Sequence, residues 1–246
     1  MAFTFPHIAE KDKEVFDFTF LNEVALKIVL PVEEEFVSFE RASRLFKELF
    51  KLPFNQENYE AICKKRQKVG NSDDSVMFEF SRKEVKISIY QSKYRSFNES
   101  MMPLLESFVK EYKKWYNYCD DVQLKFVDVW PFSDIKDVTQ KKIEDLENAV
   151  FTTALRSSSE KLNDNLKGLK CRDDNFEVDI KFGSYVPEDS SQNSGVALES
   201  RIELIRKHLN CQDIISKALE MNNVLYDAFR WAVTDNVINA MRFANK

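Results

Sequence analysis

Apolar and polar residues follow a helical period at the end of the chain. The apolar positions there are Ile214, Ala218, Met221, Leu225, Ala228, Phe229 and Ala232. Steps of three and four residues place them on one stripe of an α-helix, with polar residues on the opposite side. Thr234 and Asp235 follow, and a side-chain oxygen there can cap a second short helix that carries Val237, Ile238 and Met241. We expect this helical end of the chain to lie across a sheet.

Other segments show the same helical spacing. The expected helices are 39–52, 99–118, 139–148 and 212–233. Ser96 or Asn98 can cap the helix at 99–118, whose apolar stripe ends in tyrosine and tryptophan residues. Such a cluster could stack a base or a small ligand, but aromatic residues on a helical stripe are mostly core residues. We therefore expect a core role for them.

Alternating apolar and polar residues predict strands between these helices. The expected strands are 24–30, 76–80, 85–90, 93–97, 122–130, 150–155, 176–186 and 196–209. The second and third of them are separated by a short polar run and are expected to form a hairpin. The polar segment 157–174 is either a hairpin or a mobile loop, and 187–195 is expected to be a loop.

This order of elements predicts an α+β fold. We expect a largely antiparallel sheet in two consecutive units, with helices packed on one face and a long C-terminal helix. A polar connector at 134–138 follows a complete strand–helix–hairpin–helix–strand unit, so the expected units are 1–131 and 132–246. The two units can also form a single domain, because 246 residues suit one large domain as well as two small ones.

Composition and charge narrow the choice of partners. Hydrophobic residues make up 43% of the chain and charged residues 31%, which favours a soluble folded protein over a disordered one. The formal net charge of −5 argues against a surface built throughout for nucleic-acid phosphates, although a local basic patch would be compatible with it. Nucleic acid is therefore a possible partner that the net charge does not favour.

The cysteines and residues 1–14 give an indication of the cellular compartment. Cys63, Cys119, Cys171 and Cys211 are far apart in sequence and form no Cys-x-x-Cys pair. Structural metal sites usually show paired ligands, so we expect four reduced thiols and no metal. Residues 1–14 lack the apolar core and cleavage site of a signal peptide, and no apolar stretch reaches the roughly 18 residues of a membrane span. A cytoplasmic protein without a membrane segment is expected.

Glycine and histidine limit the chemistry. The four glycines are dispersed, which excludes the usual phosphate-cradling loop and dinucleotide-binding turn, and no cofactor is expected. The histidines are His7, near the start, and His208, inside an expected strand, and neither lies beside a candidate serine or cysteine nucleophile. Histidine-based catalysis and a histidine-ligated metal are therefore not expected.

One pattern leaves room for metal-dependent chemistry. Asp179 and Lys181 project from the same side of an expected strand, and Asp164 lies upstream. Carboxylates that hold Mg²⁺ and a lysine that stabilises developing charge are typical of metal-dependent nucleases. The same acid–x–lysine spacing recurs at Glu84, Glu111 and Asp134, a frequency that chance alone explains. We expect no catalytic residues, and keep Asp164, Asp179 and Lys181 only as the alternative.

Several segments together resemble a known family. They are 18–30 with Leu21-Asn22-Glu23-Val24, 85–94 leading to Met102-Pro103 and a helix ending in Trp115, 124–131, and Phe229-Arg230-Trp231-Ala232-Val233-Thr234-Asp235. They resemble an uncharacterised, sporadically distributed prokaryotic protein family of similar length. The family has no established activity, so the resemblance implies no catalytic or binding residue. Its distribution is similar to that of mobile defence or toxin–antitoxin genes.

The sequence leaves two main classes of function, with small-ligand sensing as a third possibility that it neither supports nor excludes. The first is a non-enzymatic binding or regulatory component that acts through protein–protein contacts, with a protein partner or a second copy of the chain, in a prokaryotic defence or toxin–antitoxin module. The alternative is a metal-dependent nuclease or another nucleic-acid-processing enzyme. We favour the first because the sequence shows no catalytic constellation and offers much strand and aromatic material for partner surfaces.

Overall fold

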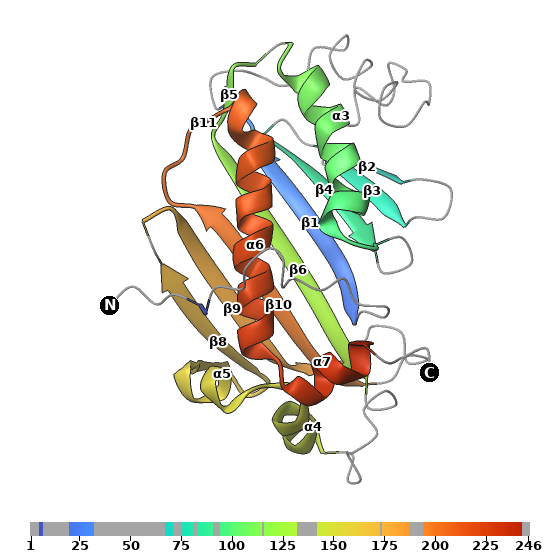
Figure 1. Ribbon diagram of the computed structural model, residues 1–246, viewed down its shortest axis with the longest axis vertical. Coiled ribbons are helices and arrows are strands. Elements are labelled where there is room, and N and C mark those ends of the chain that lie inside the picture. The colour runs from blue at the N-terminus through green and yellow to red at the C-terminus, as the bar shows by residue number, and fades with distance from the viewer. Residues whose placement is uncertain are drawn as a thin grey trace. The chain divides into compact units, whose positions relative to one another are not determined.

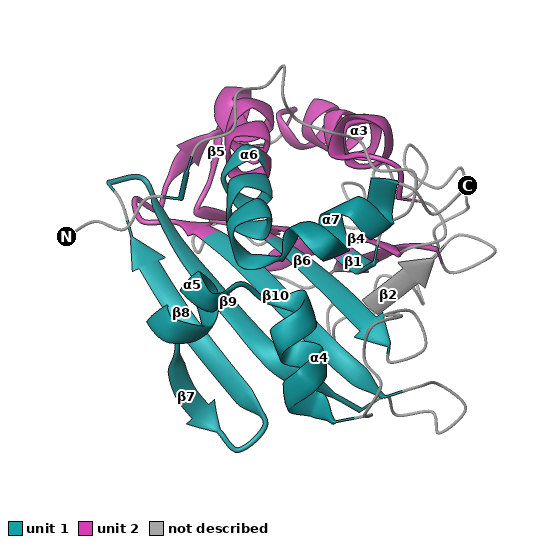
Figure 2. Ribbon diagram, turned by 60° about the horizontal axis from the view of Figure 1, so that its bottom comes forward, with its two compact units in different colours: residues 1–23, 125–202, 223–246 teal, residues 24–124, 203–222 magenta. Residues whose placement is uncertain are grey.

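The computed structural model describes residues 5–6, 20–31, 67–70, 75–80, 83–90, 94–114, 116–131, 142–172, 174–186 and 194–242. The chain divides into two compact units, each discontinuous in sequence (Figure 2). Unit 1 comprises 1–23, 125–202 and 223–246, and unit 2 comprises 24–124 and 203–222. Elements that contribute residues to both are β1 (Leu21–Val29), β6 (Asp121–Pro131), β10 (Gly195–Leu204) and α6 (Ile214–Ala232).

The strands of unit 2 follow the order β2-β3-β4-β1-β6. Those not yet given are β2 (Gln67–Gly70), β3 (Val76–Phe80) and β4 (Glu84–Tyr90). The expected hairpin is confirmed, because β3 pairs antiparallel with β4 and places Phe78 opposite Ile87. In β1 and just beyond it, Val24, Leu26, Ile28 and Leu30 are at most 1% exposed. The period-two pattern therefore identified the buried side of this strand correctly.

Helix α3 (Met102–Tyr112) lies over one face of β1, β3 and β4 (Figures 1 and 2). A π-helical turn, Phe97–Met101, precedes it, and the Ser96 hydroxyl accepts the N–H of Glu99 at 3.2 Å. Ser96 is thus the cap, as one of the two predicted candidates. Buried side chains on this helix include Leu105, Phe108 and Tyr112, which confirms the core role of its stripe.

The predicted helix 99–118 is too long. Its regular part ends at Tyr112, and the chain enters the short strand β5 (Tyr118–Cys119). β5 pairs antiparallel with β11 (Leu209–Asn210), and the Tyr112 hydroxyl donates to the carbonyl of Tyr118 at 2.9 Å. These long-range bonds outweigh the helical spacing. The predicted strand 93–97 is also wrong in its described part, where 94–96 are irregular and Phe97 begins the π-helical turn.

The strands of unit 1 follow the order β6-β10-β9-β8-β7. Those not yet given are β7 (Glu160–Asn163), β8 (Leu166–Arg172) and β9 (Phe176–Tyr185). Of the two alternatives for 157–174, the hairpin is therefore correct, since β7 and β8 pair antiparallel. β9 alternates buried and partly exposed residues along most of its length, as predicted for 176–186. Phe182 packs edge-on against Phe151, which in turn packs edge-on against Trp130.

Residues 150–155 form no strand, contrary to the prediction. Helix α4 (Ile143–Val150) ends there, and α5 (Thr153–Ser158) begins after Thr152, whose hydroxyl accepts the N–H of Leu155 at 3.2 Å. The same hydroxyl donates to the carbonyl of Trp231 at 3.0 Å. The apolar run marks two helix ends packed into the core, and periodicity over so few residues cannot separate that case from a strand.

Helix α6 confirms the predicted C-terminal helix. A single 3₁₀ turn, Cys211–Asp213, leads into it, and α7 (Asp235–Arg242) follows. The seven predicted stripe residues of α6 are at most 9% exposed. Thr234 precedes α7 as expected, and its hydroxyl donates to the carbonyl of Ala149 at 2.6 Å.

The predicted strand 196–209 is correct only in its first part. β10 ends at Leu204, residues 205–208 turn, and β11 begins at Leu209. His208 has φ 91°, a conformation that no extended strand contains. It therefore lies in a turn and not inside a strand.

The described residues form an α+β protein with a large, mainly antiparallel sheet and a long C-terminal helix, as predicted. The compact units are interleaved in sequence, and the boundary at 131–132 stays a prediction about consecutive domains. The expected helix 39–52 and the expected loop over 187–193 lie outside the described residues. Among the helices that are described, none is long and apolar enough to cross a membrane.

Candidate functional site

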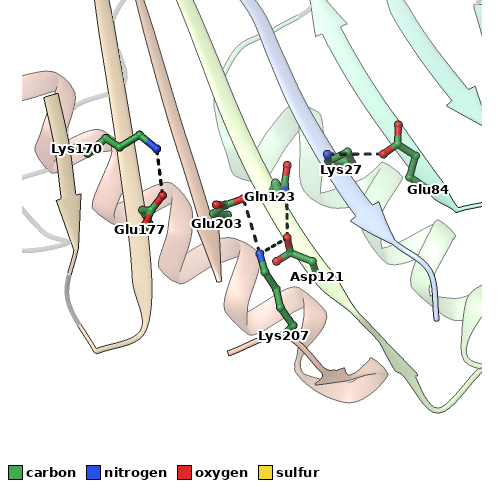
Figure 3. Close-up of polar contacts among 8 residues, drawn as sticks. All are labelled: Lys27, Glu84, Asp121, Gln123, Lys170, Glu177, Glu203 and Lys207. Carbon is green, nitrogen blue, oxygen red and sulfur yellow. Dashed lines mark hydrogen bonds and ion pairs between the residues drawn. The ribbon is translucent and has the colours of Figure 1, made fainter. Parts of the chain in front are cut away.

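Unit 2 brings polar groups together where the end of β10 lies beside the beginning of β6. Three of them come from the strands, namely Asp121, Gln123 and Glu203. Lys207 belongs to the turn at 205–208 that follows β10, and its side chain is 51% exposed. We call these four residues the Asp121 cluster; they are shown in Figure 3.

Asp121 is the centre of this cluster. Its side chain is only 6% exposed, and Oδ2 lies 2.7 Å from Nζ of Lys207. Gln123 donates through Nε2 to Oδ2 of Asp121 at 2.8 Å and to Oε2 of Glu203 at 3.0 Å. Nζ of Lys207 also lies 3.7 Å from Oε2 of Glu203. Two carboxylates are thus joined by one amide and one ammonium group.

The second carboxylate oxygen of Asp121, Oδ1, differs from Oδ2 in its hydrogen bonding. Oδ1 is buried and has no hydrogen-bond partner among the described residues. A buried acceptor without a donor destabilises a folded protein by about 1–3 kcal/mol, so such an atom calls for an explanation.

An aromatic pair adjoins the cluster. The rings of Tyr118 and His208 lie 4.0 Å apart between centroids, at 33°. The backbone N–H of His208 donates to the carbonyl of Asp120 at 2.7 Å, which holds the residue at its positive φ of 91°. A non-glycine residue in this region stores about 1–3 kcal/mol of strain, and such residues concentrate at functional sites.

The turn that carries these groups is exposed and basic. Arg206, Lys207 and His208 are consecutive, and each is exposed. The bond from the His208 N–H to the Asp120 carbonyl holds the backbone of the turn, and the Lys207 side chain pairs with Asp121. We call residues 206–208 together with Tyr118 the basic aromatic turn.

Thiol chemistry at this place is disfavoured. Burial, together with the smaller effects of Cys211, Asp121 and Asp120, raises the pKa of the Cys119 thiol to about 12. Burial also raises the pKa of the Cys211 thiol to about 11. Both groups stay protonated near neutral pH, whereas a nucleophilic cysteine must be a thiolate. These two buried cysteines are therefore structural.

The alternative site residues lie in unit 1. Lys181 Nζ is 3.3 Å from Oδ2 of Asp179 and 3.9 Å from Oε1 of Glu199, so the structure brings this acid and lysine together as an ion pair. Asp164 is 94% exposed at the β7–β8 turn and pairs with Lys161 at 2.8 Å.

Asp164 does not join Asp179. The carbonyl next to it, on Asn165, accepts the N–H of Ser184, five residues beyond Asp179 along β9. At about 3.3 Å per residue the two carboxylates are separated by roughly 16 Å, too far to share one cation. Within the described part of the chain, no group of three or more His, Cys, Asp or Glu residues could hold a metal ion.

Two other ion pairs lie on the sheet, one in each unit. Lys27 and Glu84 lie 3.6 Å apart in unit 2, and Lys170 and Glu177 lie 3.5 Å apart in unit 1 (Figure 3). Exposed pairs of this kind stabilise a protein by about 0–1 kcal/mol. They are typical of a hydrated sheet face, which distinguishes them from the buried carboxylate of Asp121.

Sequence reasoning missed the Asp121 cluster. Lys207 and Asp121 are 86 residues apart in sequence, and neither belongs to a motif. The signal that could have found the turn was Arg206-Lys207-His208 itself, since three consecutive basic residues are poorly suited to the middle of a strand with a buried face.

Comparisons with known proteins give no further guide to the site. No family model, no curated protein and no solved structure matches the chain. This result agrees with the resemblance to a family without an established activity.

Proposed function

We propose that the protein is a non-enzymatic binding component that acts through protein–protein contacts, and that the basic aromatic turn is its contact surface. The observation that carries this proposal is the exposed, strained His208, whose ring contacts that of Tyr118 and whose N–H donates to the Asp120 carbonyl. Strain at an exposed turn residue is retained where the side chain has a task that depends on its position.

The composition of the turn supports a protein partner. Tyrosine and arginine are enriched in protein interfaces, where rigid aromatic side chains bury a large area at a small entropic cost. Tyr118 and Arg206 provide both types, and neighbouring acidic residues such as Glu203 reduce the attraction for nucleic-acid phosphates. A role in a prokaryotic defence or toxin–antitoxin module is part of this proposal and rests on the resemblance alone.

The experiment is a pull-down with the tagged full-length chain from lysate of its source cells, analysed by mass spectrometry and by absorbance at 260 and 280 nm. We expect a stoichiometric protein, free of nucleic acid, that is retained by the wild type and lost with His208→Ala and Arg206→Ala. Lys161→Ala, at an exposed basic position on β7, is the matched control and should retain it. Retention by all three variants would contradict the proposal, as would nucleic acid as the captured species.

The nuclease alternative is favoured by one observation, the Asp179–Lys181 pair on β9. It predicts a Mg²⁺-dependent activity that Asp179→Ala and Lys181→Ala abolish. The binding proposal predicts that both variants retain the captured partner.

A further inference from the structure

The carboxylate of Asp121 is only half used. Its Oδ2 accepts hydrogen bonds from Lys207 and Gln123, while its Oδ1 is buried without a partner among the described residues. The side chain is 94% buried, so bulk solvent reaches little of it. One more donor, next to the ammonium group, would complete the coordination of this carboxylate.

Lys207 is the replaceable member of the cluster. Its side chain is 51% exposed and belongs to a turn, whereas Asp121 and Gln123 are set in β6. The ammonium group of Lys207 is a point charge that donates to one oxygen of the carboxylate. The planar guanidinium of arginine can donate hydrogen bonds to both oxygens at once. A guanidinium is therefore the better match for Asp121, and Glu203 adds a second carboxylate to its surroundings.

We propose that the Asp121 cluster binds an arginine side chain of the partner protein, and that Lys207 occupies this place in the free protein. The inference rests on the proposed function and names the chemistry of the partner. The guanidinium pairs with both oxygens of Asp121, and Lys207 swings into solvent. Binding of the correct partner is thereby coupled to the release of an internal ion pair.

The test uses ¹⁵N-labelled full-length protein titrated with Nα-acetyl-L-arginine amide, followed by amide chemical shifts. We expect saturable shifts centred on residues 121–123 and 203–207. The lysine analogue, Nα-acetyl-L-lysine amide, should bind at least several-fold more weakly. Lys207→Ala should tighten the binding of the arginine probe by up to about fivefold, the value of a half-exposed ion pair that no longer competes.

Two further variants, both expected to stay folded, separate a loss of binding from a loss of the fold. Lys207→Arg supplies the guanidinium within the chain, so it should raise the melting temperature and abolish binding of the probe. Glu203→Gln, at a partly exposed position, should weaken binding while the protein stays folded.

Four results would overturn the inference. They are equal affinity for the arginine and lysine probes, unchanged or weaker binding by Lys207→Ala, retained binding by Lys207→Arg, and shifts that map elsewhere. A partner whose capture depends on His208 while the arginine probe fails to bind would refute this inference and leave the proposed function standing. If partner capture does not depend on His208 and the arginine probe also fails to bind, both the inference and the proposed function are refuted.

Discussion

Asp128 provides the clearest physical prediction for the folded state. It lies on β6 with 4% of its surface exposed, and burial raises its pKa from 3.8 to about 7. We predict that Asp128→Asn stabilises the protein at pH 8 and has little effect near pH 4. The exchange keeps the size of the side chain and removes only its ability to ionise.

The magnitude follows from proton linkage. The pKa of this carboxyl is higher in the folded state, so between pH 4 and pH 7 the unfolded chain has lost a proton that the folded chain keeps. Stability therefore falls as the pH rises through this window, by about 1.4 kcal/mol per pH unit. A difference of about three pH units corresponds to about 4 kcal/mol, reached near pH 7 and constant above it.

The assay is urea unfolding followed by far-UV circular dichroism, at intervals from pH 4.5 to pH 8.5. The difference in unfolding free energy between Asp128→Asn and the wild type should grow with pH and then level off. Asp174→Asn is the control, because it makes the same chemical change at an exposed position. A difference that does not vary with pH, or one as large in the control, would refute the assignment of a buried, neutral carboxyl.

Three further predictions concern positions where the structure leaves little freedom. Gly183→Ala should destabilise the protein by about 3 kcal/mol or more, because φ is +155° and a Cβ would lie 2.0 Å from the Asn165 carbonyl oxygen. The control Gly168→Ala should destabilise it less, because the closest neighbour of that Cβ is the movable Cδ1 of Leu162. Equal melting temperatures of the two variants would contradict this prediction. Thr152→Val should lose about 1–2 kcal/mol in urea unfolding, because it removes both the cap of α5 and the bond to Trp231, whereas no loss relative to Ser157→Ala would show that the cap is dispensable. Asp179→Ala should leave partner retention unchanged in the pull-down, and its loss would move the functional surface to β9.

Elements with a long, regular period were predictable from sequence. β1 and the β3–β4 hairpin carry apolar residues at every second position, and the apolar stripe of α6 runs through most of its 19 residues. Local signals also placed the Ser96 cap correctly. In these segments tertiary contacts reinforce the local preference, so periodicity alone predicts the structure.

The secondary-structure predictions are wrong where long-range contacts determine the backbone conformation. Strand β5 interrupts an apolar helical pattern because it pairs with β11, which is distant in sequence. Val150 and Phe151 resemble a strand, yet they are buried at the end of α4 and just beyond it. In both segments the predicted backbone conformation was wrong.

The candidate site could not be predicted from sequence for the same reason. Asp121 and Lys207 meet only because β6 and the turn after β10 are brought together by the fold. The strain at His208 depends on its bond to the Asp120 carbonyl, which no residue pattern announces.

The most direct test of the central claim is partner capture by His208→Gly. Glycine adopts a φ of 91° without strain, so this variant should be as stable as the wild type or more stable, while it lacks the ring that contacts Tyr118. We predict that the variant keeps or raises its melting temperature and loses the protein partner in the pull-down. Undiminished capture of the partner by this folded variant would contradict the claim that the basic aromatic turn is the contact surface.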